Sequence, residues 1–180
     1  MHINHTETNF FLIGMMGSWK STVGRKLAEA LKLEFIDTDD VIVEMTEMKV
    51  ADIFREFSEE KFREMETAFF VEKAKQKGQL FSTGGGIILS AENRKVLQEN
   101  GITFFLDAAP QTLANRIHNT TKRPLLTNSD NLEQRLEKIR NDRHQFYLDC
   151  ADQVIKTDNL EPPQVLAEIL NILEVSNADH

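Results

Sequence analysis

Short apolar segments alternate along this chain of 180 residues with longer segments whose apolar residues recur at helical spacing. Strands that alternate with helices are joined by crossover connections, and these give a parallel sheet with helices on both faces. We therefore expect an α/β fold with three layers (α/β/α) and a central five-stranded parallel sheet. The expected strands are residues 9–13, 34–37, 79–83, 102–106 and 153–156.

The segments between these strands carry the apolar faces and the end signals of helices. Ser58 is a candidate N-cap, Gly101 marks the end of one helix, and Pro110 marks the start of another. Because no repeat or linker divides the chain, we expect one domain over residues 1–180. The expected helices are residues 20–31, 39–46, 50–57, 58–77, 91–100, 110–118, 132–147 and 163–175.

Composition excludes several classes of protein. Hydrophobic residues make up 41% of the chain and charged residues 28%, and no stretch approaches the ~20 apolar residues of a membrane span. The net charge of −8 argues against a nucleic-acid partner. The polar residues 1–9 lack the pattern of a secretion signal, and Cys150 is the only cysteine. We expect a cytoplasmic protein without a membrane partner, and a monomer, because no helix demands an oligomeric partner.

Residues 14–21 (GMMGSWKS) follow the first expected strand and precede the first expected helix. In this context the pattern G-x-x-x-x-G-K-[ST] surrounds phosphate with backbone N–H groups. Gly14, Lys20 and Ser21 match the pattern. Lys20 would place a positive charge on the outer phosphates, and the Ser21 hydroxyl would bind Mg²⁺. The segment predicts a nucleotide site, and a plain strand-to-helix turn is the alternative.

Trp19 stands where this pattern has its second glycine. Glycine permits close approach of the backbone and unusual torsion angles. The indole either obstructs the phosphate or swings outward and leaves the N–H groups in place. The sequence leaves both arrangements open.

Two further groups follow expected strands. Asp37 and Asp39 end the second strand, where one carboxylate can hold Mg²⁺ through water and the other can orient an attacking hydroxyl. Helix capping by Asp39 or Asp40 is the alternative. Residues 84–86 (GGG) end the third strand, where the backbone can approach a ligand closely, and a flexible turn is the alternative.

Two arginines are candidates for binding an anion. Arg63 lies three residues before Glu66 on a helix, so the two can form an ion pair, and a surface pair is the alternative. Arg143 falls in the apolar stripe of its helix, where it either binds an anion or snorkels at the edge of the stripe. That stripe consists of Leu132, Leu136, Ile139 and Phe146.

Residues 119–130 form a polar loop between two expected helices, with Lys122 and Arg123 as adjacent cations. Such a loop can be a lid that closes over ATP and excludes water, or an exposed charged loop. Arg116 lies about one turn before it, where it either stacks on a base or faces solvent.

Taken together, these segments resemble the shikimate kinase family from about residue 10 to residue 173. GMMGSWKSTVGR resembles the phosphate loop of the family, FIDTDDVI its Asp-x-Asp segment, STGGGIIL its triple-glycine strand end and KRPLL its lid. ADIFREFSEEKFREME resembles its substrate-binding helices, and RHQFYLDCAD resembles its R-x-P-L-Y-x-E-x-A-D helix. The phosphate loop alone indicates only a nucleotide-binding protein, whereas the whole set is specific for the acceptor.

The resemblance implies a P-loop NTPase fold and transfer of the γ-phosphoryl group of ATP to the 3-hydroxyl of shikimate, in aromatic amino-acid biosynthesis. Mg²⁺ is the implied cofactor. Asp39, Lys20 and Arg123 would be catalytic, and residues 38–66 would form the helical region that binds shikimate. The implied ATP-binding residues are Gly14, Gly17, Ser18, Trp19, Lys20, Ser21, Thr22, Arg116 and Arg123. The implied shikimate-binding residues are Asp39, Arg63, Gly84, Gly85, Gly86 and Arg143. The implied metal site consists of Ser21 and, through water, Asp37.

Two other functions stay open at the level of sequence. Because Trp19 replaces the loop glycine, the chain can be a weak or inactive binding protein of this family. A related small-molecule kinase, such as gluconate kinase, is the second alternative, although the paired arginines and the triple glycine disfavour it.

Overall fold

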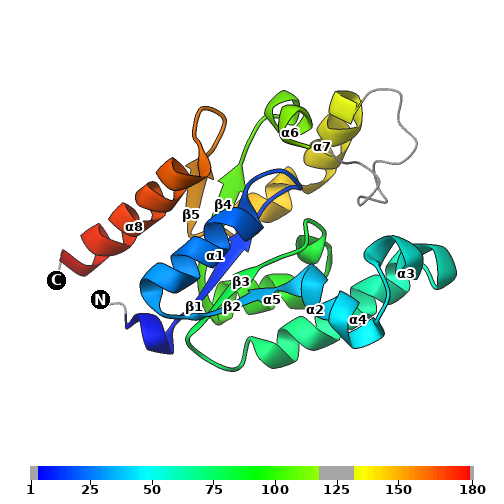
Figure 1. The fold of residues 1–180 in the computed structure, drawn as a ribbon, viewed down its shortest axis with the longest axis horizontal. Coiled ribbons are helices and arrows are strands. Elements are labelled where there is room, and N and C mark those ends of the chain that lie inside the picture. Colours follow the sequence, from blue (N-terminus) through cyan, green and yellow to red (C-terminus); the bar gives the residue numbers. More distant parts are fainter. Residues whose placement is uncertain (1–3, 118–131, 179–180) are drawn as a thin grey trace.

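The computed structural model describes residues 4–117 and 132–178. Its strands are β1 (Asn9–Ile13), β2 (Glu34–Asp37), β3 (Gln79–Ser82), β4 (Gly101–Asp107) and β5 (Gln153–Lys156). They form one parallel sheet in the order β2-β3-β1-β4-β5 (Figure 1). This sheet confirms the α/β class and the five strands predicted from the alternation of segments.

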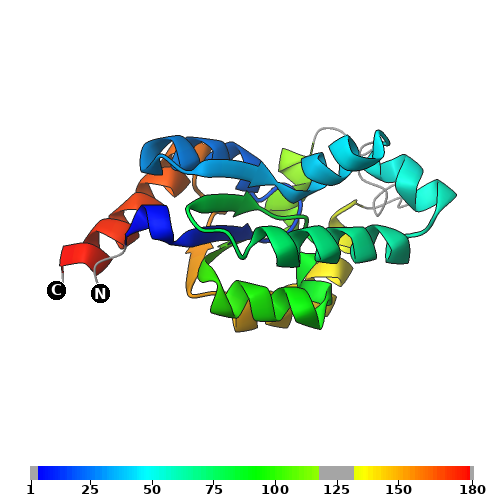
Figure 2. The ribbon, with the colours of Figure 1, turned by 90° about the horizontal axis from the view of Figure 1, so that it is seen from below.

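Helices cover both faces of the sheet. They are α1 (Lys20–Leu31), α2 (Thr38–Thr46), α3 (Val50–Glu56), α4 (Glu59–Lys73), α5 (Ala91–Glu99), α6 (Pro110–Arg116), α7 (Leu132–Cys150) and α8 (Pro162–Ala178), with single turns η1 (His5–Glu7) and η2 (Ile87–Leu89). One apolar cluster joins α1 and α8 to the sheet, and a second joins α4, α5, α6 and α7 to its other face (Figure 2). α2 and α3 pack on α4 through Ile42, Ile53 and Phe62. The result is the expected three-layer arrangement.

β1 occupies the centre of the sheet, between β3 and β4. All five of its residues are buried, since both faces of the sheet are covered. Phe10 and Leu12 contribute to the cluster of α1 and α8, whereas Phe11 and Ile13 contribute to the opposite cluster. A central parallel strand therefore appears in the sequence as one apolar run, and for this reason the position of β1 was predicted correctly.

One helix ends earlier than the sequence predicts. The helix expected over residues 58–77 ends at Lys73, because a side chain from β1 binds the carbonyl groups that follow it. Asn9 Nδ2 donates to Ala74 O at 2.9 Å and to Gln76 O at 2.7 Å. The end of α4 is thus set by a contact between distant segments. Ser58 is its N-cap, as predicted, and accepts a hydrogen bond from the backbone.

α7 is longer than predicted and continues to Cys150. Its buried stripe passes through Arg143 and Tyr147, one turn apart, and not through Phe146. Phe146 is 36% exposed and lies under the guanidinium group of Arg94, so its place in the predicted stripe is wrong. The remaining helices and strands end within three residues of their predicted bounds.

The parallel strands end at one edge of the sheet, where ligands bind in folds of this class. Ile13, Asp37 and Ser82 are the last residues of β1, β2 and β3. The segments singled out in the sequence follow these strand ends and therefore meet there. Within the described ranges, no helix is long and apolar enough to cross a membrane.

Candidate active site

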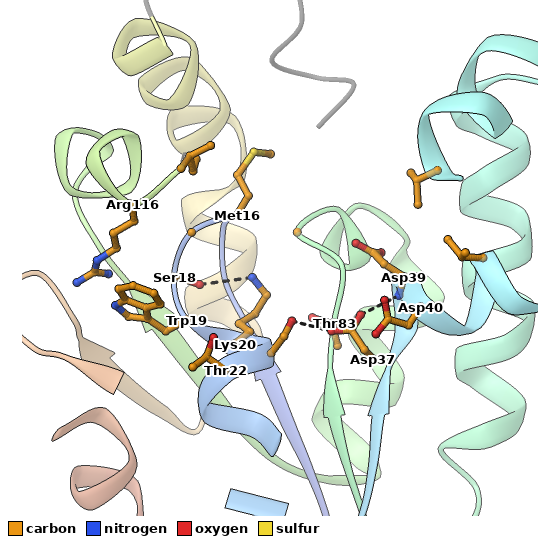
Figure 3. A pocket seen from close by; sticks show the side chains of 16 residues that line it. Met16, Ser18, Trp19, Lys20, Thr22, Asp37, Asp39, Asp40, Thr83 and Arg116 are labelled. Atoms are coloured by element: carbon orange, nitrogen blue, oxygen red, sulfur yellow. Dashed lines mark hydrogen bonds between the residues drawn. The ribbon is translucent and has the colours of Figure 1, made fainter. Parts of the chain in front are cut away.

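A pocket of about 510 Å³ opens at the carboxyl edge of the sheet. Figure 3 shows Trp19 and Arg116 at one end of it and Asp37, Asp39 and Asp40 at the other, with Lys20 between them. The predicted site residues that line it are Gly17, Ser18, Trp19, Lys20, Ser21, Thr22, Asp37, Asp39, Gly85 and Arg116. One cavity thus combines the nucleotide segment with the segment expected to hold the acceptor.

The phosphate loop joins β1 to the first turn of α1. Lys20 is 8% exposed, and its side chain turns back over the loop. Its Nζ donates to Met15 O at 2.8 Å and lies 3.4 Å from Ser18 Oγ. Gly17 has a φ of 81°, which glycine adopts without strain. A buried ammonium group beside the positive end of a helix dipole is suited to an anion such as phosphate.

Trp19 is the N-cap of α1, with φ 73° and ψ 7°. A non-glycine residue in this left-handed region costs about 1 kcal/mol. The indole packs against the cluster of α1 and α8 and lies beside Arg116 (Figure 3). The indole lies at the Arg116 end of the pocket, whose lining it shares with Lys20. The loop therefore keeps its turn without the second glycine.

Ser21 and Asp37 form the candidate metal site. Ser21 Oγ donates to Asp37 Oδ2 at 2.6 Å and lies 3.1 Å from Ser82 Oγ. Hydroxyl and carboxylate oxygens suit Mg²⁺, which keeps several waters and usually binds through one or two carboxylates together with substrate phosphates. Residues 4–117 and 132–178 contain no group of three or more His, Cys, Asp or Glu side chains able to hold a metal. The donors present fit a magnesium ion that binds together with a nucleotide.

Asp39 lies in the first turn of α2, at the other end of the pocket. Asp37 Oδ1 accepts a hydrogen bond from Asp39 N at 3.2 Å, which makes Asp37 the N-cap of this helix. Capping by Asp39 or Asp40 is therefore wrong, because the helix begins one residue earlier than predicted. Asp39 Oδ1 lies 2.6 Å from the place where a Cβ atom would stand on Gly84. The carboxylate of Asp39 is thus packed against the triple glycine.

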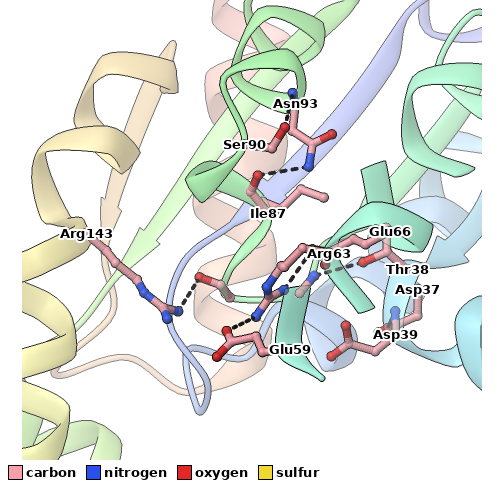
Figure 4. Close-up of polar contacts among 12 residues, drawn as sticks. Asp37, Thr38, Asp39, Glu59, Arg63, Glu66, Ile87, Ser90, Asn93 and Arg143 are labelled. Atoms are coloured by element: carbon pink, nitrogen blue, oxygen red, sulfur yellow. Dashed lines mark hydrogen bonds and ion pairs between the residues drawn. The ribbon is translucent and has the colours of Figure 1, made fainter. Parts of the chain in front are cut away.

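Arg63 and Glu66 form an ion pair within the protein (Figure 4). Arg63 Nη1 donates to Glu66 Oε2 at 2.8 Å, and Nη2 donates to Glu59 Oε1 at 3.2 Å. The Glu66 side chain is 1% exposed, so the alternative of a surface pair is wrong. Burial, with a smaller contribution from Asp39, raises the pKa of Glu66 to about 7 against the opposing charge of Arg63. Among the described residues, Glu66 Oε1 has no hydrogen-bond partner.

The triple glycine connects the two arginines expected to bind an anion. Gly85 O accepts hydrogen bonds from Arg143 Nη1 at 3.1 Å (Figure 4) and from the Tyr147 hydroxyl. The guanidinium group of Arg63 lies so close to Gly86 that a Cβ atom there would overlap it. Gly84 and Gly86 are therefore positions of close approach, whereas a Cβ atom on Gly85 would make only ordinary contacts. Arg143 is 8% exposed, which confirms its predicted place on the buried side of its helix.

Arg116 ends α6 and lies at the same end of the pocket as Trp19 (Figure 3). Its Nη1 donates to Thr157 Oγ1 at 3.0 Å, and its Nη2 donates to Thr157 O. Its Cζ lies 4.9 Å from the centre of the Trp19 ring, so the side chain is fixed at the rim and does not extend into solvent. The expected lid, residues 119–130, and Arg123 lie outside the described residues.

Two residues that contact the triple glycine were not predicted from the sequence. Thr38 Oγ1 accepts a hydrogen bond from Gly84 N at 2.9 Å and ties α2 to the triple glycine. No sequence signal marked Thr38, because the contact joins distant segments. Tyr147 lies four residues after Arg143, and helical spacing would have placed the two on one face.

Comparisons with known proteins agree with this geometry. A family model described as shikimate kinase matches residues 16–174. A shikimate kinase from Caldicellulosiruptor bescii is 40% identical over 164 residues, which cover 91% of this chain and 94% of that protein. A shikimate kinase from Legionella pneumophila is 41% identical over 165 residues, which cover 92% and 94%.

Solved structures show the same relationship. Shikimate kinase from Acinetobacter baumannii in complex with shikimate superposes with a TM-score of 0.91 at 34% identity, and the match covers 96% of each chain. A gluconokinase from Sinorhizobium meliloti, with a TM-score of 0.57 at 17% identity, shares the fold alone. On the extent of these matches, the chain belongs to the shikimate kinase family.

Proposed function

We propose that this protein transfers the γ-phosphoryl group of ATP to the 3-hydroxyl group of shikimate, with Mg²⁺ as the metal. The observation that carries this proposal is the grouping of Asp39, Arg63 and Arg143 around the triple glycine, of which Gly85 lines the same pocket as Lys20. The guanidinium groups of Arg63 and Arg143 suit the carboxylate of the acceptor, and the carboxylate of Asp39 suits its hydroxyl group.

The two arginines would clamp the acceptor carboxylate. Arg63 is held in place by Glu59 and Glu66, and Arg143 by the carbonyl group of Gly85. Both side chains are largely buried, and a buried cation is stabilised by an anionic partner. A planar guanidinium group can bind a carboxylate through two parallel hydrogen bonds, which also fixes the orientation of the acceptor.

The chemistry would proceed by direct transfer. The 3-hydroxyl oxygen forms a bond to the γ-phosphorus while the bond from that phosphorus to the bridging oxygen of ADP breaks. Asp39 holds the hydroxyl and accepts its proton. Lys20 stabilises the negative charge on the transferring group, and by the family resemblance Arg123 does so too. Because the transition state of such a transfer is loose, positioning and charge neutralisation supply most of the rate.

Ser21 and, through water, Asp37 would hold the magnesium ion. When bound with ATP, the ion neutralises charge on the β- and γ-phosphates. The hydrogen bond between Ser21 Oγ and Asp37 Oδ2 holds both oxygens at the same place beneath the phosphate loop. This arrangement needs no further protein ligand, since water and phosphate oxygens complete the coordination.

The alternatives left open by the sequence are less well supported. The gluconokinase shares only the fold, whereas the relatives at about 40% identity are shikimate kinases. The binding-only alternative depended on obstruction by Trp19, and the indole lies to the side of the loop beside Arg116.

The proposal is tested by two substitutions with opposite signatures. Arg63→Ala removes a charged donor for the carboxylate and should weaken shikimate binding roughly tenfold or more, with ATP binding unchanged. Lys20→Ala should lower kcat by roughly 10²- to 10³-fold, with shikimate binding retained. Calorimetric titration with shikimate and an ADP-release assay separate the two effects.

Arg55→Ala is a matched control for the first variant. Arg55 lies on the neighbouring helix α3, and its side chain is 69% exposed. Its removal should leave both measurements unchanged. Normal shikimate affinity in Arg63→Ala would contradict the carboxylate clamp.

A further inference from the structure

Trp19 lies in the phosphate loop, yet its side chain has no part in the proposed reaction. It adopts left-handed torsion angles that favour glycine, with φ 73°, and it is the only tryptophan of the chain. A bulky residue in such a conformation persists where the surrounding structure compensates for it. The contacts of the indole show what that compensation is.

The indole is held by its ring surface. It packs against the apolar cluster of α1 and α8, while Arg116 Cζ lies 4.9 Å from the ring centre. Its Nε1 is buried and has no hydrogen-bond partner among the described residues. Stacking and apolar contact therefore fix the ring, and its N–H group contributes nothing that a phenyl ring would lack.

The guanidinium group of Arg116 is engaged along its edges. Its Nη atoms donate to Thr157 Oγ1 and Thr157 O, and to Leu160 O at 3.3 Å. Its Cζ atom lies over the indole ring, so the indole packs against one side of this planar group. Arg116 lines the pocket at the same end as Trp19. The face opposite the indole is thus the surface that this side chain can offer to a flat ligand ring.

We propose that Trp19 is a positioning residue for the nucleotide. It braces Arg116 from behind, so that the opposite guanidinium face is held ready to stack on the base of ATP. The inference rests on the proposed function, because it takes the bound nucleotide to be ATP. The loss of a glycine from the phosphate loop is offset by a more rigid platform for the base.

Calorimetric titration with ADP and with inorganic tripolyphosphate tests this proposal, because only ADP carries a base. Trp19→Gly should weaken ADP binding roughly threefold to thirtyfold, the range of a cation–π contact, and should leave tripolyphosphate binding unchanged or tighter. Trp19→Phe keeps a ring and should retain most of the ADP affinity. In turnover, KM for ATP should rise in Trp19→Gly, with little change in kcat or in KM for shikimate.

A second variant tests whether Trp19 acts through Arg116. Arg116→Lys keeps the charge but removes the planar face, so it should weaken ADP binding by itself. Trp19→Gly added to Arg116→Lys should then have little further effect, because the two residues contribute to one contact. Additive losses in the double variant would overturn the bracing role.

Two other results would also overturn it. Tighter ADP binding by Trp19→Gly would mean that the indole occupies the place of the base. Equal losses for ADP and tripolyphosphate would mean that Trp19 acts only on the fold of the loop. Both titrations are made without shikimate and without turnover, so a failure of the proposed phosphoryl transfer would leave this test intact.

Discussion

At the scale of single residues, Glu66 shows how burial gives an ordinary ion pair a functional consequence. Its side chain is buried, and its Oε2 atom holds Arg63. Its pKa is raised from the ordinary value of 4.5 to about 7, first by burial and then, against the charge of Arg63, by Asp39. Arg143 lowers the pKa to a smaller extent. A carboxyl group that titrates near neutral pH therefore lies within the proposed shikimate site.

Shikimate binding should depend on this titration. Below pH 7 Glu66 becomes neutral, so the negative charge that opposes an anionic ligand disappears. We expect the dissociation constant for shikimate to fall about fivefold between pH 8 and pH 6, which corresponds to about 1 kcal/mol of charge interaction. Calorimetric titration across this pH range measures the change.

Glu66→Gln is the control for the pH dependence. Glutamine keeps the shape and an acceptor oxygen for Arg63 but does not titrate, so its shikimate affinity should be flat over the same range. An unchanged slope in Glu66→Gln would show that another group causes the dependence.

The raised pKa of Glu66 also fixes the direction in which stability changes with pH. The folded protein binds the Glu66 proton more tightly than the unfolded chain does, so this group lowers stability as pH rises through about 7.

At the scale of elements, the turn after β3 is shaped by what lies against it. Gly84, Gly85 and Gly86 separately face Asp39, the phosphate loop and Arg63. A side chain at Gly86 would therefore displace the guanidinium group of Arg63.

Gly86→Ala should displace Arg63 and weaken shikimate binding roughly tenfold or more, with ATP binding retained. Stability should change little, because the displaced group is the end of a flexible side chain and the backbone angles of Gly86 (φ −103°, ψ 1°) suit alanine. Calorimetric titrations with shikimate and with ADP measure both affinities.

Gly85→Ala is a matched control on the same turn. Its Cβ would meet Gly14 O at 3.5 Å, an ordinary contact. The loss of shikimate affinity should be smaller than in Gly86→Ala, because no charged group is displaced. Equal losses in the two alanine variants would mean that the turn needs flexibility and that close approach to Arg63 is not the reason for the glycine.

Asn9 links β1 to the end of α4 and to the start of β3. Its Nδ2 donates to Ala74 O and Gln76 O, and its Oδ1 accepts a hydrogen bond from Gln79 N at 3.2 Å. Asn9→Ala should lower the free energy of unfolding by about 2–3 kcal/mol, because buried backbone groups lose their partner.

Denaturant unfolding checks this value. Asn141→Ala, at an exposed position of α7, should change stability by no more than about 0.5 kcal/mol. If the free energy of unfolding falls by less than about 1 kcal/mol in Asn9→Ala, close to the change in the control, water replaces the asparagine.

The same contacts explain how much of the elements the sequence could predict. The bounds of β1, α1, β2 and β5 were predicted without error, because apolar runs and helical faces are local signals. The end of α4 was not, since Asn9 lies far away in the sequence. At the site, Lys20 was predicted from the phosphate-loop pattern, and Arg143 was predicted from its place in the apolar stripe of its helix. The contacts of Thr38 and the direction of the Trp19 ring depend on packing between distant segments, which no local pattern records.

At the scale of the whole molecule, several cations gather at one edge of a chain that is acidic overall. The net charge is −8, yet Lys20, Arg63, Arg116 and Arg143 gather about the carboxyl edge of the sheet. The fold itself does not identify the acceptor, because the gluconokinase shares it at 17% identity. The acceptor is instead specified by which side chains the parallel strands bring together at that edge.

The central claim is that the native chain phosphorylates shikimate with Trp19 in its phosphate loop. A coupled ADP-release assay with ATP and Mg²⁺ tests it most directly, on the native chain and on Trp19→Gly, with shikimate, with gluconate and without acceptor. We predict ADP release from both proteins with shikimate and only background release with gluconate. Absence of shikimate-dependent ADP release from a folded native chain that still binds shikimate would contradict the account.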